Sequence, residues 1–512
     1  MSDYGLFVGE RTVVLGYIYL TVQNILSTFI GVLGYSFLTR CVSQVDFGVL
    51  AGLMLLASFF QLVSDFGLSS SLAKFVSELM GRGENPSGYF LSAFVFRASL
   101  ALALSLLLFT FPEKFSALLF KSTLYSPSVR LLSFDVVLVS LAPLLSGFLL
   151  GAGRLRVLAC CGIASVLARW VAIVLFLLKG FGVWGVVLGW VVGDLVGVAL
   201  YIVAVSRLRV WDGFTPNLGA FLSVLLRFSL PLYIASLVNF LFSYYDRAVV
   251  LAFLPLSDVG VYDVVGKVFG VFVSVTVPFS SALFPYYGSA YGRGERDLIG
   301  SAVGRASKYS ALVFAPLALG LFSVSRPVLA LFAGEGYEGG AAVLSILSLF
   351  ALVYSVSPAL SNLLLIYGRT LTVLLLSLVS VGVSLAALPL LWRFGLCGLA
   401  VVKGLSMLSS FVLSLWVLSG VVGLRFDGRA LLKIFCSAAV MALAVLLVER
   451  VWYSAFLLPF YVVVGAAVYA LSLRFLSVLD DQDALLLERV FGARVASIVC
   501  KLLYRRGAAG AC

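Results

Sequence analysis

The sequence predicts an all-α integral membrane protein with about fourteen transmembrane helices. Of its 512 residues, 62% are hydrophobic and only 11% are charged, whereas soluble domains contain about 25% charged residues. Apolar runs close to the ~20 residues that a helix needs to cross a bilayer recur along the chain. The links between these runs are too short to form a sizeable soluble domain.

Apolar run lengths place the predicted helices in chain order. They cover residues 13–38, 48–65, 89–110, 131–150, 158–178, 183–203, 229–251, 260–283, 309–328, 342–365, 371–391, 396–418, 431–448 and 453–473. We expect the first to be retained, because no small-residue cleavage site accompanies it.

The distribution of positive charge predicts the orientation. An even number of spans places both termini on one side of the membrane. Links and span ends on that side hold 22 Lys and Arg residues, and those on the opposite side hold 9. Because the cytoplasmic side is the one enriched in Lys and Arg, we expect a multi-pass protein of the cell membrane with both termini cytoplasmic.

The chain repeats itself. Four motif pairs recur in the same order at separations of 211–215 residues. They are VDFGV at 45–49 and SDVGV at 257–261, GRGE at 81–84 and 292–295, a twelve-residue pattern at 143–154 and 358–369, and G-x-x-G at 182–185 and 395–398. Each repeat contains six spans, and an even number gives both repeats the same orientation.

The repeat predicts the domain organisation. We expect an N-terminal six-helix lobe at residues 1–205 and a parallel six-helix lobe at 206–420, arranged around a central cleft. Two additional transmembrane helices follow at 421–475. Residues 476–512 have apolar residues at helical spacing and a basic end, which predicts a cytoplasmic amphipathic tail on the inner membrane surface. A plain solvated tail is the alternative.

Composition also argues against several kinds of site. The chain has no histidine, and its seven cysteines lack metal-ligand spacing. A polymerase or glycosyltransferase would need acidic or metal-binding residues gathered in a large loop, and no link is of that kind. We therefore expect no enzymatic activity, no metal or cofactor, and no nucleic-acid partner.

Charged residues gather at the junction of the seventh and eighth spans. Asp246 and Arg247 lie where one apolar run ends, and Asp263 and Lys267 lie four residues apart in the next, on one helix face. Charges in hydrocarbon are costly and need a reason. Two interpretations remain open for Asp246, Arg247 and Asp263: an outer gate, or a fixed clamp between the two helices.

Several stretches resemble a known family. They are SDFGLSSSLAKFVSEL from Ser64, FSLPLY near Phe228, YYDRAVVLAFLPLSDVGVY from Tyr244, LFAGEGYEGGAAVLSIL from Leu331 and IYGRT from Ile366. With the six-plus-six-plus-two arrangement, these resemble the Wzx-like polysaccharide-biosynthesis flippases of the multidrug/oligosaccharidyl-lipid/polysaccharide exporter superfamily. The resemblance covers essentially the whole chain.

The resemblance implies a flippase. Its substrate would be a polyprenyl-phosphate- or polyprenyl-diphosphate-linked oligosaccharide, moved from the cytoplasmic to the outer leaflet by alternating access, and the protein would act as a monomer among membrane lipids. The alternative is a cation-coupled exporter of drugs or metabolites from the same superfamily.

A lipid-linked sugar presents an anionic phosphate, so buried cations are the groups to seek for a flippase. Arg97, Arg169, Lys267 and Lys403 lie inside predicted spans and are candidates for a cationic cavity, since guanidinium and ammonium groups bind phosphate. The competing interpretation is charge pairing, of Arg169 with Asp194 and of Lys267 with Asp263.

Intramembrane carboxylates are the groups to seek for ion coupling, because they are the usual coupling groups of transporters. Asp194 lies near the middle of the sixth span and Asp135 lies four residues into the fourth. These two are the candidates to bind H⁺ or Na⁺.

Overall fold

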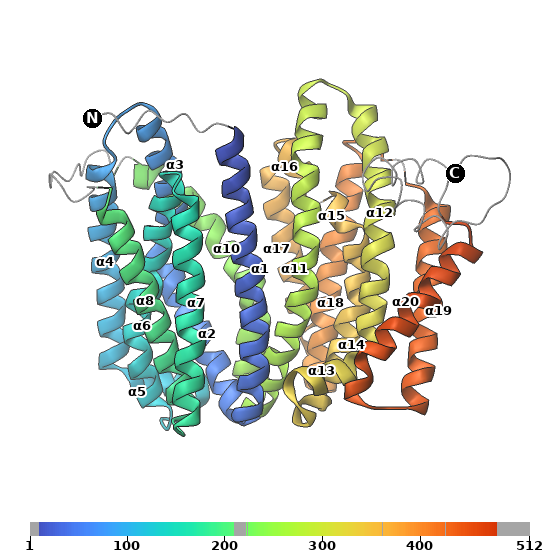
Figure 1. Ribbon diagram of the computed structural model, residues 1–512, viewed down its shortest axis with the longest axis horizontal. Coiled ribbons are helices and arrows are strands. Elements are labelled where there is room, and N and C mark those ends of the chain that lie inside the picture. Colours follow the sequence, from blue (N-terminus) through green and yellow to red (C-terminus); the bar gives the residue numbers. More distant parts are fainter. Residues whose placement is uncertain (1–9, 209–221, 223, 361, 425, 479–512) are drawn as a thin grey trace. The chain divides into compact units, whose positions relative to one another are not determined.

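The computed structural model describes residues 10–208, 222, 224–360, 362–424 and 426–478, and every regular element in these ranges is a helix (Figure 1). The chain divides into two compact units, Met1–Val261 and Tyr262–Cys512, with the division inside one helix. Most of the predicted tail lies outside the described residues.

The first unit is a bundle of long helices with one short helix between two of them. Its elements are α1 (Glu10–Cys41), α2 (Gln44–Asp65), α3 (Leu68–Gly81), α4 (Ser87–Thr110), α5 (Pro112–Phe120), α6 (Ser126–Gly151), α7 (Leu155–Leu178), α8 (Gly182–Ser206), a π-helical turn (Leu225–Ser229), α10 (Leu230–Phe253) and the start of α11 (Leu256–Gly292).

The second unit continues from α11 and is more interrupted. Its elements are α12 (Arg296–Ser323), α13 (Ser325–Ala333), a 3₁₀ turn (Glu335–Gly340), α14 (Ala341–Phe350), a 3₁₀ turn (Ala351–Ser355), α15 (Ser357–Leu360), α16 (Leu363–Ile366), α17 (Thr370–Ala387), α18 (Pro389–Ser419), α19 (Gly428–Val451), a 3₁₀ turn (Ala455–Leu457) and α20 (Leu458–Phe475).

The all-α membrane fold is confirmed. Within the described residues, 13 helices are long and apolar enough to cross a bilayer, and a shorter apolar helix at Leu371–Ala387 occupies the predicted span 371–391. One prediction was wrong in detail. The span 342–365 is not a continuous helix, because a 3₁₀ turn separates α14 from two one-turn helices.

Elements recur with the sequence repeat. The short helix α5 has its counterpart in α13, which has the same length of nine residues and lies 213 residues later. Three pairs of glycines at equivalent positions of the two repeats have a positive φ, which favours glycine. Within each pair the two φ values are nearly equal: 74° and 74°, 69° and 68°, and 51° and 56°. These pairs are Gly83 and Gly294, Gly153 and Gly368, and Gly182 and Gly395. Three of the four motif pairs thus mark a turn or a kink at the same place in both repeats.

The two repeats differ at one place. The segment from Gln44 to Gly81 in the first repeat corresponds to the segment from Leu256 to Gly292 in the second. The first segment forms two helices, α2 with 22 residues and α3 with 14, whereas the second forms the single 37-residue helix α11. The break lies at Phe66 and Gly67, whose φ values are 45° and 71°. Chain segments of nearly equal length thus form a jointed pair in one repeat and a continuous rod in the other.

The core of the first unit lies between α3, α4, α6 and α8, where Phe90 and Phe148 pack with ring centroids 4.7 Å apart. Beside it, α7 packs closely on α8 through glycines spaced four residues apart. A Cβ on Gly189 would lie 2.3 Å from Ile173 Cγ1 and 2.9 Å from its backbone nitrogen. Small residues at this spacing let two membrane helices approach closely.

In the second unit, the C-terminal helices α19 and α20 pack on α12 around Ala311, Ile434 and Met441. A polar cluster near the ends of these helices adds to their packing on the rest of the unit. Arg326 Nε donates to Glu338 at 2.8 Å and Tyr453 Oη donates to the same carboxylate at 2.8 Å. Burial and this hydrogen bond raise the pKa of Tyr453 to about 12, so the phenol stays protonated.

Replacing Gly189 with Leu should lower the melting temperature of the purified protein, since the new side chain would overlap Ile173 and overpacking costs about 1–3 kcal/mol. The matched control is Gly270→Leu in α11, where nothing lies within 4 Å of the added Cβ. Equal melting temperatures for the two variants would contradict the close packing of α7 on α8.

Candidate functional site

Two acids and one base form a cluster inside the first unit. Arg169 of α7 donates from Nη2 to Asp194 Oδ1 of α8. Asp135 of α6 interacts electrostatically with both of them. Asp135 and Asp194 are 3% and 7% exposed, whereas the Arg169 side chain remains 34% exposed. We call these three residues the acid–arginine cluster.

The helix packing places this cluster. Gly193 precedes Asp194, and a Cβ there would lie 2.3 Å from Arg169 Cβ and 2.8 Å from its Cα. Only a glycine lets the two backbones meet at this level. Ser165 fixes the same contact one turn away by donating to the Gly193 carbonyl at 2.9 Å.

The cluster holds unequal charge. With every group ionised, two carboxylates face one guanidinium, which leaves a net charge of −1 in a place where charge is costly. Asp135 Oδ1 and Arg169 Nε have no hydrogen-bond partner among the described residues. Binding of one monovalent cation would neutralise the cluster.

A second cluster surrounds Arg97. The Arg97 side chain is 0% exposed and donates from Nη1 to Asp65 of α2 and, at 2.6 Å, to Ser69 Oγ of α3. Ser69 Oγ also donates to Asp65 at 2.5 Å. The left-handed turn at Phe66–Gly67 makes this possible, because it keeps both acceptors beside α4.

Arg97 therefore differs from the expectation of a cation facing an open cavity. Its charge is neutralised by Asp65, and its side chain is enclosed by α2, α3 and α4 in this conformation. The sequence did not indicate Asp65 as the partner of Arg97, since Asp65 lies on another helix, at the predicted end of a span. The geometry favours a structural role for Arg97.

The other two candidate cations lie in the second unit. Lys267 Nζ lies 4.0 Å from Asp263 Oδ2, one turn away on α11, so the pairing that competes with phosphate binding is present. Asp263 is 3% exposed. Lys403 is partly buried in α18. Their role toward a substrate stays a prediction.

Asp246 and Arg247 lie in the last two turns of α10. Asp246 is 6% exposed and its Oδ1 accepts the backbone N–H of Arg247 at 3.0 Å. The Arg247 guanidinium lies 5.3 Å from the ring centroid of Tyr244. The choice between gate and clamp stays open.

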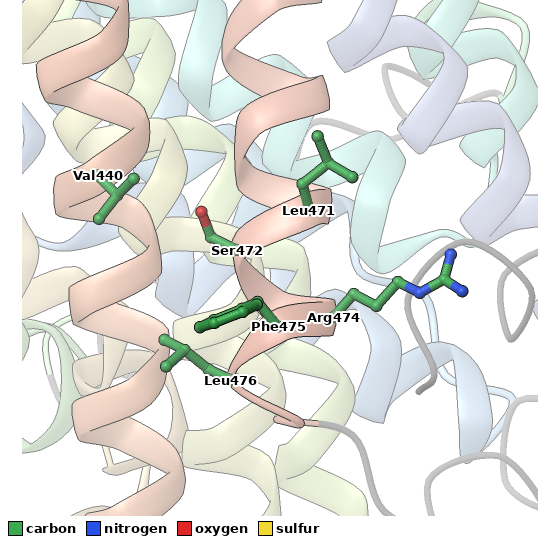
Figure 2. Close-up of a pocket in the computed structure, with 6 residues that line it drawn as sticks. All are labelled: Val440, Leu471, Ser472, Arg474, Phe475 and Leu476. Atoms are coloured by element: carbon green, nitrogen blue, oxygen red, sulfur yellow. The ribbon is translucent and has the colours of Figure 1, made fainter. Parts of the chain in front are cut away.

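An apolar groove of about 660 Å³ lies on α19 and α20. Figure 2 shows Val440, Phe475 and Leu476 between the two helices, with Arg474 extending away from α19. The residues that line this groove include no acidic residue. They belong to the second compact unit, whereas the acid–arginine cluster belongs to the first. We therefore place the candidate site at the cluster.

The fold defines the class. This is a multi-pass α-helical membrane protein with the fold of known transporters. It resembles the structure described as "Lipid II flippase MurJ, inward closed conformation" with a TM-score of 0.71 and 15% identity, over 90% of this chain and 98% of that one. An inward-facing MATE-family multidrug transporter gives a TM-score of 0.63 and 17% identity, over 78% and 97%.

The family follows from the sequence. The family model described as "Polysaccharide biosynthesis protein" matches residues 37–342, and the chain belongs to this family. This confirms the resemblance seen in its motifs.

Two curated relatives have names that point the same way. The succinoglycan biosynthesis transport protein ExoT of Rhizobium meliloti is 27% identical over 62% of this chain and 63% of its own length. The probable low-salt glycan biosynthesis flippase Agl15 of Haloferax volcanii is 24% identical over 38% and 41%. The match thus spans less than two thirds of either relative.

Breaking the Arg97–Asp65 pair should lower stability. Arg97→Met or Asp65→Leu alone leaves one charge enclosed without its partner, at a cost of about 3 kcal/mol, whereas the double variant should lose less than the sum. Thermal unfolding of the four proteins measures this cycle.

The control is Arg82→Ala, which removes an exposed partner of Glu78 and should cost under about 1 kcal/mol. Additive losses in the cycle, or an Arg97→Met protein that stays stable but no longer transports, would contradict the structural role.

Proposed function

We propose that this protein is a flippase that moves a polyprenyl-phosphate- or polyprenyl-diphosphate-linked oligosaccharide from the cytoplasmic to the outer leaflet of the cell membrane. One observation carries the proposal. A chain of the polysaccharide biosynthesis family holds a guanidinium, Arg169, that is deep in its helix bundle and still one-third exposed. Guanidinium groups bind phosphate oxygens in a bidentate geometry.

The names of related proteins support this substrate class. A biosynthesis transport protein and a glycan flippase share sequence with the chain, and a lipid II flippase shares its fold. We infer a transporter without catalytic activity, which acts as a monomer with both termini cytoplasmic. Its lobes, residues 1–205 and 206–420, would alternate access to the two sides.

The acid–arginine cluster suggests how an ion could drive the cycle. While Asp194 accepts a hydrogen bond from Arg169, the guanidinium is neutralised and binds phosphate poorly. One proton or Na⁺ on the Asp135–Asp194 pair would halve the negative charge of the pair. This weakens its attraction for Arg169 and favours binding of an anionic headgroup by the guanidinium. Ion binding and substrate binding would then favour each other.

The alternative function is a cation-coupled exporter of drugs or metabolites. The observation that favours it is the same buried acid pair, since intramembrane carboxylates are typical coupling groups. The two functions differ at Arg169. A flippase needs its positive charge for the phosphate, and an exporter of neutral or cationic compounds does not.

Arg169→Ala should lower flipping far more than protein abundance. The variant loses the proposed phosphate contact, and the loss of the partner of Asp194 should also cost about 3 kcal/mol of stability. The assay uses reconstituted vesicles with a fluorescent polyprenyl-diphosphate-linked oligosaccharide that dithionite quenches in the outer leaflet. Arg130→Ala, at an exposed pair with Glu113, is the control and should flip normally. Flipping that survives Arg169→Ala would remove the cationic-site mechanism.

Asp194→Asn and Asp135→Asn should each make flipping insensitive to an imposed H⁺ or Na⁺ gradient, since an amide keeps the shape of the carboxyl and cannot titrate. The parent protein should speed up several-fold under the gradient, and running H⁺ and Na⁺ gradients separately identifies the ion. A parent rate unaffected by both would contradict coupling. Transport that follows the gradient, survives Arg169→Ala and vanishes with Asp194→Asn would favour the exporter.

A further inference from the structure

The internal repeat brings two copies of one motif into direct contact. Gly48 belongs to VDFGV near the start of α2, and Gly260 is its counterpart in SDVGV near the start of α11, 212 residues later. Both glycines are buried, and both lie in the same compact unit, Met1–Val261.

The contact is reciprocal in atomic detail. A Cβ on Gly48 would lie 1.9 Å from the carbonyl oxygen of Leu256, and a Cβ on Gly260 would lie 2.1 Å from the carbonyl oxygen of Gln44. Gln44 and Leu256 are themselves the first residues of α2 and α11 and are 212 residues apart.

The backbone nitrogens are arranged in the same reciprocal way. The Gly260 nitrogen lies 3.2 Å from the position of a Cβ on Gly48, and the Gly48 nitrogen lies 3.0 Å from the position of a Cβ on Gly260. This is the arrangement of a two-fold interface, in which residue i meets j and j meets i. A local two-fold axis therefore passes between the two glycines.

Glycine is required here by space, since neither residue has a positive φ. The Cα–H bonds of each glycine face a carbonyl oxygen of the other helix, as in the weak C–H···O contacts of close helix pairs. Two backbones this close leave no room for water. At the two glycines themselves, backbone atoms of one helix therefore contact backbone atoms of the other.

One turn further along α2, the contacts of the helix are made by side chains. A Cβ on Gly52 would lie 2.5 Å from the Phe120 ring and 3.4 Å from Leu251 Cδ1. Leu251 is 5% exposed. The glycine contact thus covers a side-chain layer that lies behind it.

We propose that the Gly48–Gly260 contact is a latch that holds the outer ends of α2 and α11 together and parts once in each transport cycle. The predicted orientation places the starts of α2 and α11 on the outer side. At the two glycines the latch consists of backbone contacts, and it closes in one register because each glycine fits against the first carbonyl of the other helix, that of Leu256 or of Gln44. The proposal rests on transport as the function, and its test needs no substrate.

The test measures accessibility of a cysteine placed behind the latch. Leu251→Cys is labelled in vesicles with a membrane-impermeant maleimide added from outside, and labelling of the parent chain is subtracted. Gly48→Ala, Gly260→Ala and the double variant are compared in this background. The controls are Gly81→Ala and Gly266→Ala, where no atom lies within 4 Å of the added Cβ.

Each single latch variant should raise the labelling rate about tenfold, since an overlap with a carbonyl oxygen cannot be relieved by a rotamer change and shifts the population to the parted state. The double variant should label no faster than either single one, because one methyl group already parts both backbones. The two controls should label like the parent.

Three results would overturn the latch. The first is an unchanged labelling rate in both single variants, and the second is additive effects in the double variant. The third is a labelling rate that rises only in proportion to the loss of thermal stability, which would indicate a fixed contact that opens by local unfolding. Failure of the flipping assay with normal latch labelling would instead count against the proposed substrate and leave the latch intact.

Discussion

A charge inside hydrocarbon must find its counter-charge within the protein, and the helix packing of the first unit serves this constraint. Arg169 reaches Asp194 only because Gly193 brings α7 and α8 together. Arg97 reaches both Asp65 and Ser69 because the chain bends at Phe66–Gly67, directly after α2. The two arginines look alike in sequence, yet one is enclosed and the other partly exposed. Each arginine is thus neutralised by an acid of another helix, and the two differ in how far the bundle encloses them.

Much of the fold could be predicted because a bilayer imposes few options. A chain must cross it as helix or barrel, so apolar run lengths located nearly every span. Turn glycines at equal spacing gave the repeat, since a left-handed residue such as Gly83 or Gly153 marks a helix end. The pairing of Arg169 with Asp194 was also predictable, because both lie near mid-span on consecutive helices.

The remaining features depend on packing that a linear pattern does not contain. From the sequence, Asp65 is a residue at the predicted end of a span. The turn after it brings Ser69 close to both Asp65 and Arg97. The interruption of the span 342–365 had Pro358 as a signal, but its repeat counterpart Pro143 lies inside the continuous helix α6. Proline alone therefore does not decide where a membrane helix breaks.

The joint at Phe66–Gly67 gives the two repeats unequal mechanical properties. The second repeat has a single helix of 37 residues, which corresponds to about 55 Å. Pro278 and Pro285 lie in its second half, where each removes a backbone hydrogen bond. The matching segment of the first repeat can absorb rotation at its joint, where a non-glycine residue, Phe66, is held at φ of 45°. The two repeats thus differ in where their chain can bend, at a left-handed turn in one and at prolines in the other.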